Sequence, residues 1–374
     1  MLNIAIIGMG GMGSKYAKML FENKDLGFNV VAVTRVKGKN LENVKDYIDN
    51  VLIYESDEAL FKGFDNKEFA CDAILVVTPH LRHEYDVKEA FKRNLHVICD
   101  KPAGVSLSQG LNMLNSNVNN NVYGFIFQQR YFPIYSKIKE ILESKKYGKI
   151  KRVNCTVTDW YRTNAYYVSQ SWRATYKTDG GGILLNQCPH TLDILYYLFG
   201  MPQSVIAHCE CGKYHPIEVE DEVSALMKYK DNFTLTFITS TGELPGVNRI
   251  EIVLDRAVIN VYKTYIEIYE NEHEEKYYRN MSLDEYVTPI PKYTKIEFAP
   301  YSNAYIDIFR NFNNAISGKE NIKISGLEAL NSLYLSNAMY LSSWQNKEIK
   351  FYDLKSEKIN DFIKEFEMEF NKKI

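Results

Sequence analysis

The chain has 374 residues, of which 45% are hydrophobic and 25% are charged, with a formal net charge of -2. This length exceeds most single hydrophobic cores, so two domains are expected. The near-neutral charge gives no electrostatic reason to expect nucleic acid or an anionic membrane as a partner. The chain starts without a basic leader, and no apolar run nears the roughly 20 residues that span a bilayer. We therefore expect a cytoplasmic protein.

The six cysteines are scattered along the chain without a C-x-x-C pair. This spacing is typical of reduced thiols that pack as small apolar residues, and not of a disulfide framework. Cys209 and Cys211 would point the same way from a strand, but no second pair of ligands follows them. We therefore predict no metal site.

The first motif is a glycine-rich loop between a buried strand, Asn3–Ile7, and a helix, Ser14–Phe21. The loop reads GMGGMG, the G-x-G-x-x-G fingerprint of dinucleotide-binding proteins in its required strand–turn–helix context. Its glycines allow a tight turn, let the backbone approach a pyrophosphate and let helix and strand pack closely, while the helix start offers N–H groups to phosphate. The predicted cofactor contacts from this loop are Gly8, Gly10, Gly11, Met12 and Gly13.

The second strand, Val30–Thr34, should end near the adenosine ribose of the cofactor. An Asp or Glu at this point would bind the 2′-hydroxyl of NAD, but the chain continues with Arg35 and, two and four residues later, Lys37 and Lys39. A guanidinium can bind a 2′-phosphate by donating two parallel hydrogen bonds to its oxygens. Thr34 and Arg35 are therefore predicted to bind a cofactor that is NADP rather than NAD. The alternative is a solvated basic turn at the sheet edge.

Further strand–helix units follow along the first third of the chain. Cys71–Val77 reads as a central strand that leads into a helix over about 83–93, and His96–Cys99 reads as the next strand. Such alternation predicts a doubly wound parallel sheet, a Rossmann domain over residues 1–125, with ligands at the carboxyl ends of its strands. Residues at these ends are predicted to contact the cofactor: Thr78, Pro79, His83, Asp100 and Lys101.

The pattern changes after Gly148, where strands follow one another through short connections that suggest hairpins. This predicts an α+β domain over residues 126–374 with a large, mostly antiparallel open sheet. Seven strands are expected, over 151–159, 204–211, 222–230, 232–240, 249–254, 257–262 and 265–269. One helix, beginning at Pro189, is expected within the sheet region, and helices over about 301–317 and 326–345 close the domain. The tail from Leu354 reads as an amphipathic surface helix.

A glycine triplet, Gly180–Gly182, precedes the helix that begins at Pro189. Glycines permit close backbone approaches that other residues resist. His190 and Asp193, three residues apart, would share one face of the helix, with Asn186 just before it. One interpretation is a glycine-lined reaction site with an imidazole at a helix start. The other is a glycine loop that leads into a core helix.

Three motifs, separated along the chain, resemble those of the Gfo/Idh/MocA family of NAD(P)-dependent oxidoreductases. They are GMGGMG at 8–13, TPHLRH with HVICDKPAG within 78–104, and GGGILLNQCPHTLD at 180–193. Together with the order of the domains, the similarity extends over nearly the whole chain. Two departures occur: Asp100 replaces the usual Glu of the E-K-P signature, and Asn186 and Cys188 replace an Asp and a Gly of the third motif.

The resemblance implies roles for single residues. Lys101 takes the position of the family's catalytic lysine, and the Lys101–Pro102 peptide bond is expected to be cis. His190 takes the position of the acid/base, and Asn186 stands where an Asp often binds a substrate hydroxyl or tunes the lysine. The predicted substrate contacts are Lys101, Arg130, Trp172, Arg173, Asn186 and His190, although the arginines and the tryptophan are equally consistent with structural roles.

The leading hypothesis is a dehydrogenase or reductase that transfers a hydride between nicotinamide and a secondary hydroxyl or carbonyl of a sugar, inositol or related polyol. A homodimer or homotetramer is implied by the resemblance, through the open face of the large sheet. One alternative is a glycosidase that retains its nicotinamide and acts by transient oxidation. Another is a regulator that binds NAD(P) without chemistry, against which the presence of both Lys101 and His190 argues.

Overall fold

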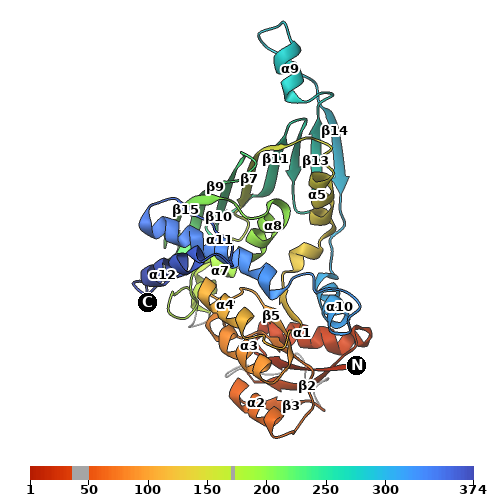
Figure 1. Cartoon of the computed structure of the whole chain (residues 1–374), viewed down its shortest axis with the longest axis vertical. Coiled ribbons are helices and arrows are strands. Elements are labelled where there is room, and N and C mark those ends of the chain that lie inside the picture. Colours follow the sequence, from red (N-terminus) through yellow and green to blue (C-terminus); the bar gives the residue numbers. More distant parts are fainter. Residues whose placement is uncertain (36–49, 170–172) are drawn as a thin grey trace. The chain divides into compact units, whose positions relative to one another are not determined.

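The structure is a computed structural model that describes residues 1–35, 50–169 and 173–374. The chain divides into two compact units (Figure 1). Unit 1 comprises Met1–Gln128 and Ser302–Leu333, and unit 2 comprises Gln129–Tyr301 and Tyr334–Ile374. Among the described residues, no helix combines the length and the apolar character that a membrane crossing requires.

Unit 1 is built on a parallel six-stranded sheet with the order β3-β2-β1-β4-β5-β6. The order runs outward in both directions from β1, so the carboxyl ends of β1 and β4 lie at the point where the strand order reverses, where such sheets bind ligands. The strands are β1 (Leu2–Ile7), β2 (Phe28–Thr34), β3 (Leu52–Tyr54), β4 (Ala73–Val76), β5 (His96–Asp100) and β6 (Tyr123–Ile126).

The helices of unit 1 follow the strands and cover the sheet (Figure 1). Central strands are buried on both faces, as β4 shows with four buried residues in a row. The helices are α1 (Gly11–Glu22), α2 (Asp57–Asp65), α3 (His83–Lys92), α4 (Leu107–Asn115) and α10 (Ala304–Ile316), with short 3₁₀ turns η1 (Lys24–Leu26) and η3 (His80–Arg82). The predicted strands and the helix over 83–93 are confirmed to within two residues.

Residues 302–333 return to unit 1 from the far end of the sequence. The apolar face of α10 packs on the sheet and on α1: Phe312 stacks on Phe28 of β2 at 6.0 Å, and Phe309 lies 6.0 Å from Tyr16 of α1. The amide of Phe125 donates to the carbonyl of Ile324 at 3.0 Å, which extends the hydrogen bonding beyond β6. The domain boundary between residues 125 and 126 stays a prediction. The sequence did not indicate that residues 302–333 join unit 1, because helical periodicity does not show which sheet a helix will cover.

Unit 2 contains a nine-stranded sheet with the order β14-β13-β12-β11-β7-β10-β9-β8-β15. All its neighbours pair in antiparallel fashion except β7 and β10, which are parallel, so the sheet is mostly antiparallel as predicted. The strands are β7 (Ile150–Val157), β8 (Ser204–Cys211), β9 (Glu220–Lys228), β10 (Thr234–Ser240), β11 (Asn248–Leu254), β12 (Ala257–Val261), β13 (Tyr265–Glu270), β14 (Lys292–Glu297) and β15 (Ile349–Lys350).

Helices cover one face of this sheet, and buried and exposed residues alternate along β9 and β10. The helices are α5 (Pro133–Glu143), α6 (Asn164–Val168), α7 (Ile183–Asn186), α8 (Pro189–Phe199), α9 (Glu275–Met281) and α12 (Lys358–Phe370), with η4 (Gln128–Tyr131) ahead of α5 and the second half of α11 (Gly326–Gln345). Figure 1 shows α5 and α8 beside each other over the sheet.

The expectation of a single helix in the sheet region is wrong, because α6, α7 and α9 also lie there. Each has seven residues or fewer, too short for a helical period to be read from sequence. The tail helix is confirmed as α12, and its apolar residues Phe362 and Phe366 are buried, with Phe366 5.5 Å from the ring of Trp344.

Candidate functional site

The glycine loop joins the end of β1 to the start of α1. Gly8 adopts φ +101°, and a Cβ placed on it would lie 2.5 Å from the carbonyl oxygen of Val77. A Cβ on Gly13 would lie 2.1 Å from the carbonyl oxygen of Gly8. By contrast, a Cβ on Gly10 or Gly11 would meet no atom within 4 Å. Two glycines are thus required by packing, and the other two leave the backbone open to a ligand, as a pyrophosphate needs.

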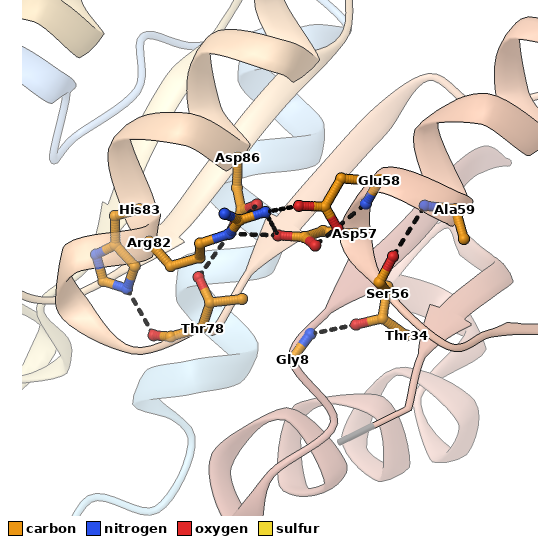
Figure 2. A network of polar contacts seen from close by, with 10 residues as sticks. All are labelled: Gly8, Thr34, Ser56, Asp57, Glu58, Ala59, Thr78, Arg82, His83 and Asp86. Atoms are coloured by element: carbon orange, nitrogen blue, oxygen red, sulfur yellow. Dashed lines mark hydrogen bonds and ion pairs between the residues drawn. The ribbon is translucent and has the colours of Figure 1, made fainter. Parts of the chain in front are cut away.

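Thr34 holds this loop to the neighbouring strand. Its hydroxyl accepts a hydrogen bond from the Gly8 amide at 2.8 Å, and its side chain is buried (Figure 2). The predicted cofactor residue Thr34 therefore shapes the loop from the end of β2.

Arg35 follows β2 with about half of its side chain exposed, at 49%. Its Nε lies 3.6 Å from a carboxylate oxygen of Glu55, and its amide donates to the carbonyl of Tyr54 at 2.7 Å. An acidic residue therefore does lie at this edge, contributed by the segment after β3 instead of by β2. Lys37 and Lys39 lie outside the described residues.

Behind the loop that follows β4, Thr78 joins a network of carboxyl groups (Figure 2). Its hydroxyl donates to Asp86 at 2.7 Å, and Arg82 donates to Asp57 at 2.7 Å and also to Glu58. Burial, followed by a hydrogen bond with Asp57, raises the pKa of Asp86 to about 8. Burial also opposes the charge on Asp57, but hydrogen bonds from Asp86 and Arg82 lower the pKa of Asp57 overall. We therefore expect the pair to share one proton at neutral pH, held on Asp86.

This shared proton predicts a pH dependence of stability. Because the pKa of Asp86 is about 8 in the folded chain, above its ordinary 3.8, the folded state holds a proton that the unfolded state releases. Stability from this group is therefore present below about pH 4 and is lost as pH rises towards about pH 8. Asp86→Asn keeps the neutral shape, so its free energy of unfolding relative to wild type should rise between about pH 5 and about pH 8 in urea titrations. A difference that stays constant with pH would contradict the shared proton.

His83 lies at the start of α3 with no exposed surface. Its Nε2 is 2.9 Å from the carbonyl oxygen of Thr78, and its Nδ1 is 3.0 Å from that of Pro102. Burial lowers the pKa of His83 to about 4. The ring thus links the loop after β4 to the loop after β5, and we expect His83 to support Thr78 and Pro79, which are predicted to contact the cofactor.

Asp100 is the last residue of β5 and Lys101 follows it, and the Lys101–Pro102 peptide bond is cis, as predicted. The Lys101 amide donates to the Asp100 carboxylate at 2.9 Å. Burial raises the pKa of Asp100, although Lys101 and a hydrogen bond from Tyr16 oppose this. Tyr16, on α1, also bonds Tyr305 of α10. Polar contacts from the buried Tyr16 to the half-buried Asp100 and Tyr305 therefore hold the segment that carries the lysine.

In unit 2, the glycine triplet leads directly into α7 and α8. His190 is the second residue of α8 and is 9% exposed, and Asn186 is the last residue of α7. The Asn186 amide group donates to Asp179 at 3.4 Å, and its carbonyl oxygen accepts from the Tyr166 hydroxyl at 3.5 Å. Asn186 therefore hydrogen-bonds to polar groups of its own unit, and its role in substrate binding stays a prediction.

A small cavity of about 10 Å³ lies beside Asn186. It is lined by Tyr166, Tyr167, Arg173, Ala174, Asp179, Gly182, Asn186, Gln187 and Val219. Gln187 donates to the Tyr166 hydroxyl at 3.3 Å, and the Arg173 guanidinium lies 4.3 Å from the centre of the Tyr166 ring. Arg173 therefore lines this cavity, and its role in substrate binding stays a prediction. Trp172 lies outside the described residues.

Arg130 forms a buried, bidentate ion pair with Asp193. Its Nε and one terminal nitrogen each lie 2.7 Å from a different oxygen of the carboxylate, and the two side chains are 7% and 0% exposed. The guanidinium also lies 5.3 Å from the ring of Tyr197. This pair ties α8 to the segment before α5, which gives Arg130 a structural role; its role in substrate binding stays a prediction.

Sequence reasoning missed several polar residues that support these segments, namely Tyr16, Asp86, Tyr166, Gln187 and Glu220. Tyr16, Asp86 and Glu220 lie at buried positions of a helix or a strand, where a polar residue is unusual. That signal becomes visible only once the buried face is known. Tyr166 and Gln187 lie in short helical or irregular segments with no periodic pattern.

Comparisons with known proteins agree with these features. Residues 2–125 match the model of an oxidoreductase family with an NAD-binding Rossmann fold, and residues 135–260 match the GFO/IDH/MocA C-terminal domain. The chain is 21% identical over 365 residues to myo-inositol 2-dehydrogenase from Thermotoga maritima, which covers 94% of this chain and 99% of that protein. It is also 28% identical over 203 residues to trans-1,2-dihydrobenzene-1,2-diol dehydrogenase from Xenopus laevis, an alignment that covers 53% of this chain and only 57% of that protein.

Solved structures share the fold over most of the chain. The WlbA dehydrogenase from Bordetella pertussis, in complex with NADH and UDP-GlcNAcA, has a TM-score of 0.76 at 20% identity and covers 94% of this chain and 99% of its own. Levoglucosan dehydrogenase, in complex with NADH and levoglucosan, has a TM-score of 0.76 at 17% identity and covers 94% and 100%. With the two family matches in the order expected of the two units, the chain belongs to the Gfo/Idh/MocA family of oxidoreductases, with an NAD-binding Rossmann fold in residues 2–125.

Proposed function

We propose that the protein is an NAD(P)-dependent dehydrogenase or reductase acting on a secondary hydroxyl or carbonyl of a sugar, inositol or related polyol. The observation that carries the proposal is the open backbone at Gly10 and Gly11, which a Cβ would not fill, between two glycines that packing requires. The dehydrogenase names of the inositol and diol relatives support the reaction and a substrate with hydroxyl groups.

The catalytic groups in this proposal are Lys101 and His190, with Asn186 as a substrate contact. The bound nicotinamide would accept or supply the hydride. A histidine titrates near neutral pH and can take the hydroxyl proton as the carbinol is oxidised. A lysine ammonium stabilises the negative charge that develops on the same oxygen. Asn186 cannot act as a base, because an amide does not take up a proton at neutral pH, so it serves by hydrogen bonding.

The test is turnover by purified protein with NAD and NADP against a panel of inositols, aldoses, diols and sugar acids. We expect reduction of the cofactor at 340 nm with at least one polyol. Tight cofactor binding without any turnover would overturn the proposal and favour a regulator. Cleavage of a glycoside without net cofactor turnover would favour the retained-cofactor glycosidase instead.

Arg35 is available to a 2′-phosphate, and for this reason we propose that NADP is accepted in preference to NAD. Glu55, 3.6 Å from Arg35, opposes this preference, because its carboxylate competes with the phosphate and repels it.

A pair of variants measures this competition. Glu55→Gln should raise the ratio of kcat/KM for NADP to that for NAD by about threefold to tenfold, as expected when about 1 kcal/mol of repulsion is removed at an exposed site. Arg35→Ala should lower the same ratio. Glu58→Gln serves as the matched control, since Glu58 bonds Arg82 instead. If Arg35→Ala leaves the ratio unchanged, Arg35 does not read the 2′-phosphate.

We further propose a homodimer or homotetramer formed through the uncovered face of the large sheet. Exposed apolar side chains on adjacent strands of this face support it: Ile206 and Leu226 lie opposite each other in β8 and β9, at 47% and 37% exposure, and Ile238 follows in β10. A cytoplasmic location stays a prediction.

A further inference from the structure

A carboxylate lies buried beneath the glycine triplet. Glu220, the first residue of β9, is 1% exposed. One of its oxygens accepts from the Gly182 amide at 2.9 Å, and the other accepts from the Leu184 amide at 2.9 Å and from the Tyr340 hydroxyl at 2.5 Å. The carboxylate thus binds both sides of the turn at which α7 begins.

The glycines fit around this carboxylate and its tyrosine. A Cβ on Gly181 would lie 2.2 Å from the Tyr340 hydroxyl oxygen. A Cβ on Gly182 would lie 2.0 Å from the backbone oxygen of Glu220 and 2.9 Å from a side-chain oxygen. Two of the three glycines are therefore explained by contacts with Glu220 and Tyr340, and need no ligand to account for them.

The turn that Glu220 holds is continuous with the residues proposed to meet substrate. The Asn186 amide donates to the carbonyl of Gly182 at 3.0 Å, and the Cys188 amide donates to that of Ile183 at 2.8 Å. Pro189 and His190 follow immediately as the first residues of α8. A shift of Gly182 and Leu184 would therefore be passed along the backbone to Asn186 and His190.

The three hydrogen-bond donors stabilise the charged form of the Glu220 carboxylate, whereas its burial disfavours that form. Burial raises the pKa of Glu220 to about 7, while hydrogen bonds from Tyr340, Leu184 and Gly182 act in the opposite direction. Hydrogen bonds to an ionised acceptor are shorter and stronger than those between neutral groups. A glutamine has the same shape but replaces one acceptor oxygen with an NH₂ group, which would face a donor.

We infer that Glu220 and Tyr340 are positioning residues, which set the placement of Asn186 and His190 by holding the Gly180–Gly182 turn. Neither touches substrate or cofactor in this account. The inference deepens the proposed function and rests on it for its kinetic consequences. The anchoring of the Gly182 and Leu184 amides can be measured without any turnover.

The first experiment compares Glu220→Gln with Glu222→Gln. Glu222 lies on the same strand and bonds Lys213 and Tyr214, so its replacement removes charged contacts away from the turn. For Glu220→Gln we expect kcat for the polyol to fall about 10-fold to 100-fold, as for a small misplacement of a catalytic group, with the affinity for NAD(P)H unchanged. Glu222→Gln should leave both near the wild-type values.

The second experiment is a rescue. Gly181→Ala should lower kcat because its methyl group meets the Tyr340 hydroxyl. Adding Tyr340→Phe removes that oxygen and should restore part of the activity, although Tyr340→Phe alone lowers it. Tyr334→Phe is the matched control, because the Tyr334 hydroxyl on the same helix bonds the Tyr352 amide at 3.1 Å instead. Combined with Gly181→Ala, Tyr334→Phe should rescue nothing.

Amide hydrogen exchange separates the possible outcomes. In wild type, the Gly182 and Leu184 amides should be protected, and Glu220→Gln should speed their exchange about 10-fold or more, as expected when a charge-assisted hydrogen bond of at least about 1.4 kcal/mol is lost. If wild type turns over no polyol, the proposed function fails, and this exchange result alone decides for or against the anchor. If Glu220→Gln changes neither the exchange nor kcat, or lowers only the melting temperature, the inference is wrong.

Discussion

Replacing His190 with alanine should lower kcat by about 10²- to 10⁴-fold, the range for loss of a general acid or base. Lys101→Ala should cause a loss of similar or greater size, because the lysine is proposed to place a positive charge beside the reacting oxygen and so to act on the same step. The affinity of His190→Ala for NAD(P)H should stay within about twofold of wild type, because the glycine loop that is proposed to bind the cofactor lies in unit 1 and His190 lies in unit 2. Steady-state kinetics and cofactor fluorescence titration measure the two quantities.

The controls for these variants are exposed residues of the same types. His208 on β8 is 74% exposed and contacts Glu210, and Lys92 on α3 is 65% exposed and contacts Glu89. His208→Ala and Lys92→Ala should retain wild-type kcat. If His190→Ala kept full activity on the substrate that the panel identifies, another group would have to take the proton, and the role proposed for His190 would be wrong.

Gly13→Ala should abolish cofactor binding and destabilise unit 1. The added methyl group would lie 2.1 Å from the backbone oxygen of Gly8, and neither the strand end nor the helix start can yield without moving the loop. Overpacking of this kind typically costs about 1–3 kcal/mol, and more where backbone atoms are in contact. Isothermal titration with NAD and NADP, together with urea unfolding, measures both effects.

Gly11→Ala is the matched control for stability, since a Cβ at Gly11 would meet no atom within 4 Å and Gly11 is the first residue of α1. Its free energy of unfolding should equal that of wild type or exceed it slightly, because alanine favours the helix over glycine. Equal unfolding free energies for Gly13→Ala and Gly11→Ala would show that the loop can widen, and the packing role assigned to Gly13 would then fail.

The strands and the cofactor loop were predictable because their signals are local. A buried strand, a glycine loop and a helix follow one another within the first 22 residues, and the structure has β1, the loop and α1 in that order. The strand Ser204–Cys211 was predicted with the bounds that the structure gives, because its residues favour a strand between clear turn residues. The short elements β3, β15 and α9 gave no comparable pattern, because each has fewer residues than a reliable period requires.

The roles of polar residues were harder to predict, because they depend on partners far away in sequence. Arg130 finds Asp193 63 residues later, and Glu220 finds Tyr340 120 residues later. Nothing in the immediate neighbourhood of either residue indicates its partner. From the sequence, Arg130 was consistent with both a substrate contact and a structural role. The structure shows its buried ion pair, and substrate binding stays a prediction.

The sequence by itself determined the doubly wound sheet, the dinucleotide loop and the two segments proposed for chemistry, because each depends on residue types at fixed spacing. Only the tertiary structure decided what holds those segments. It showed Thr34 bonded to the loop, Asp86 bonded to Thr78, and a carboxylate at Glu220 that accounts for two of the three glycines ahead of Asn186 and His190. The physical reason is that spacing along the chain is encoded locally, whereas the desolvation and pairing of buried polar groups depend on elements that meet only when the chain has folded.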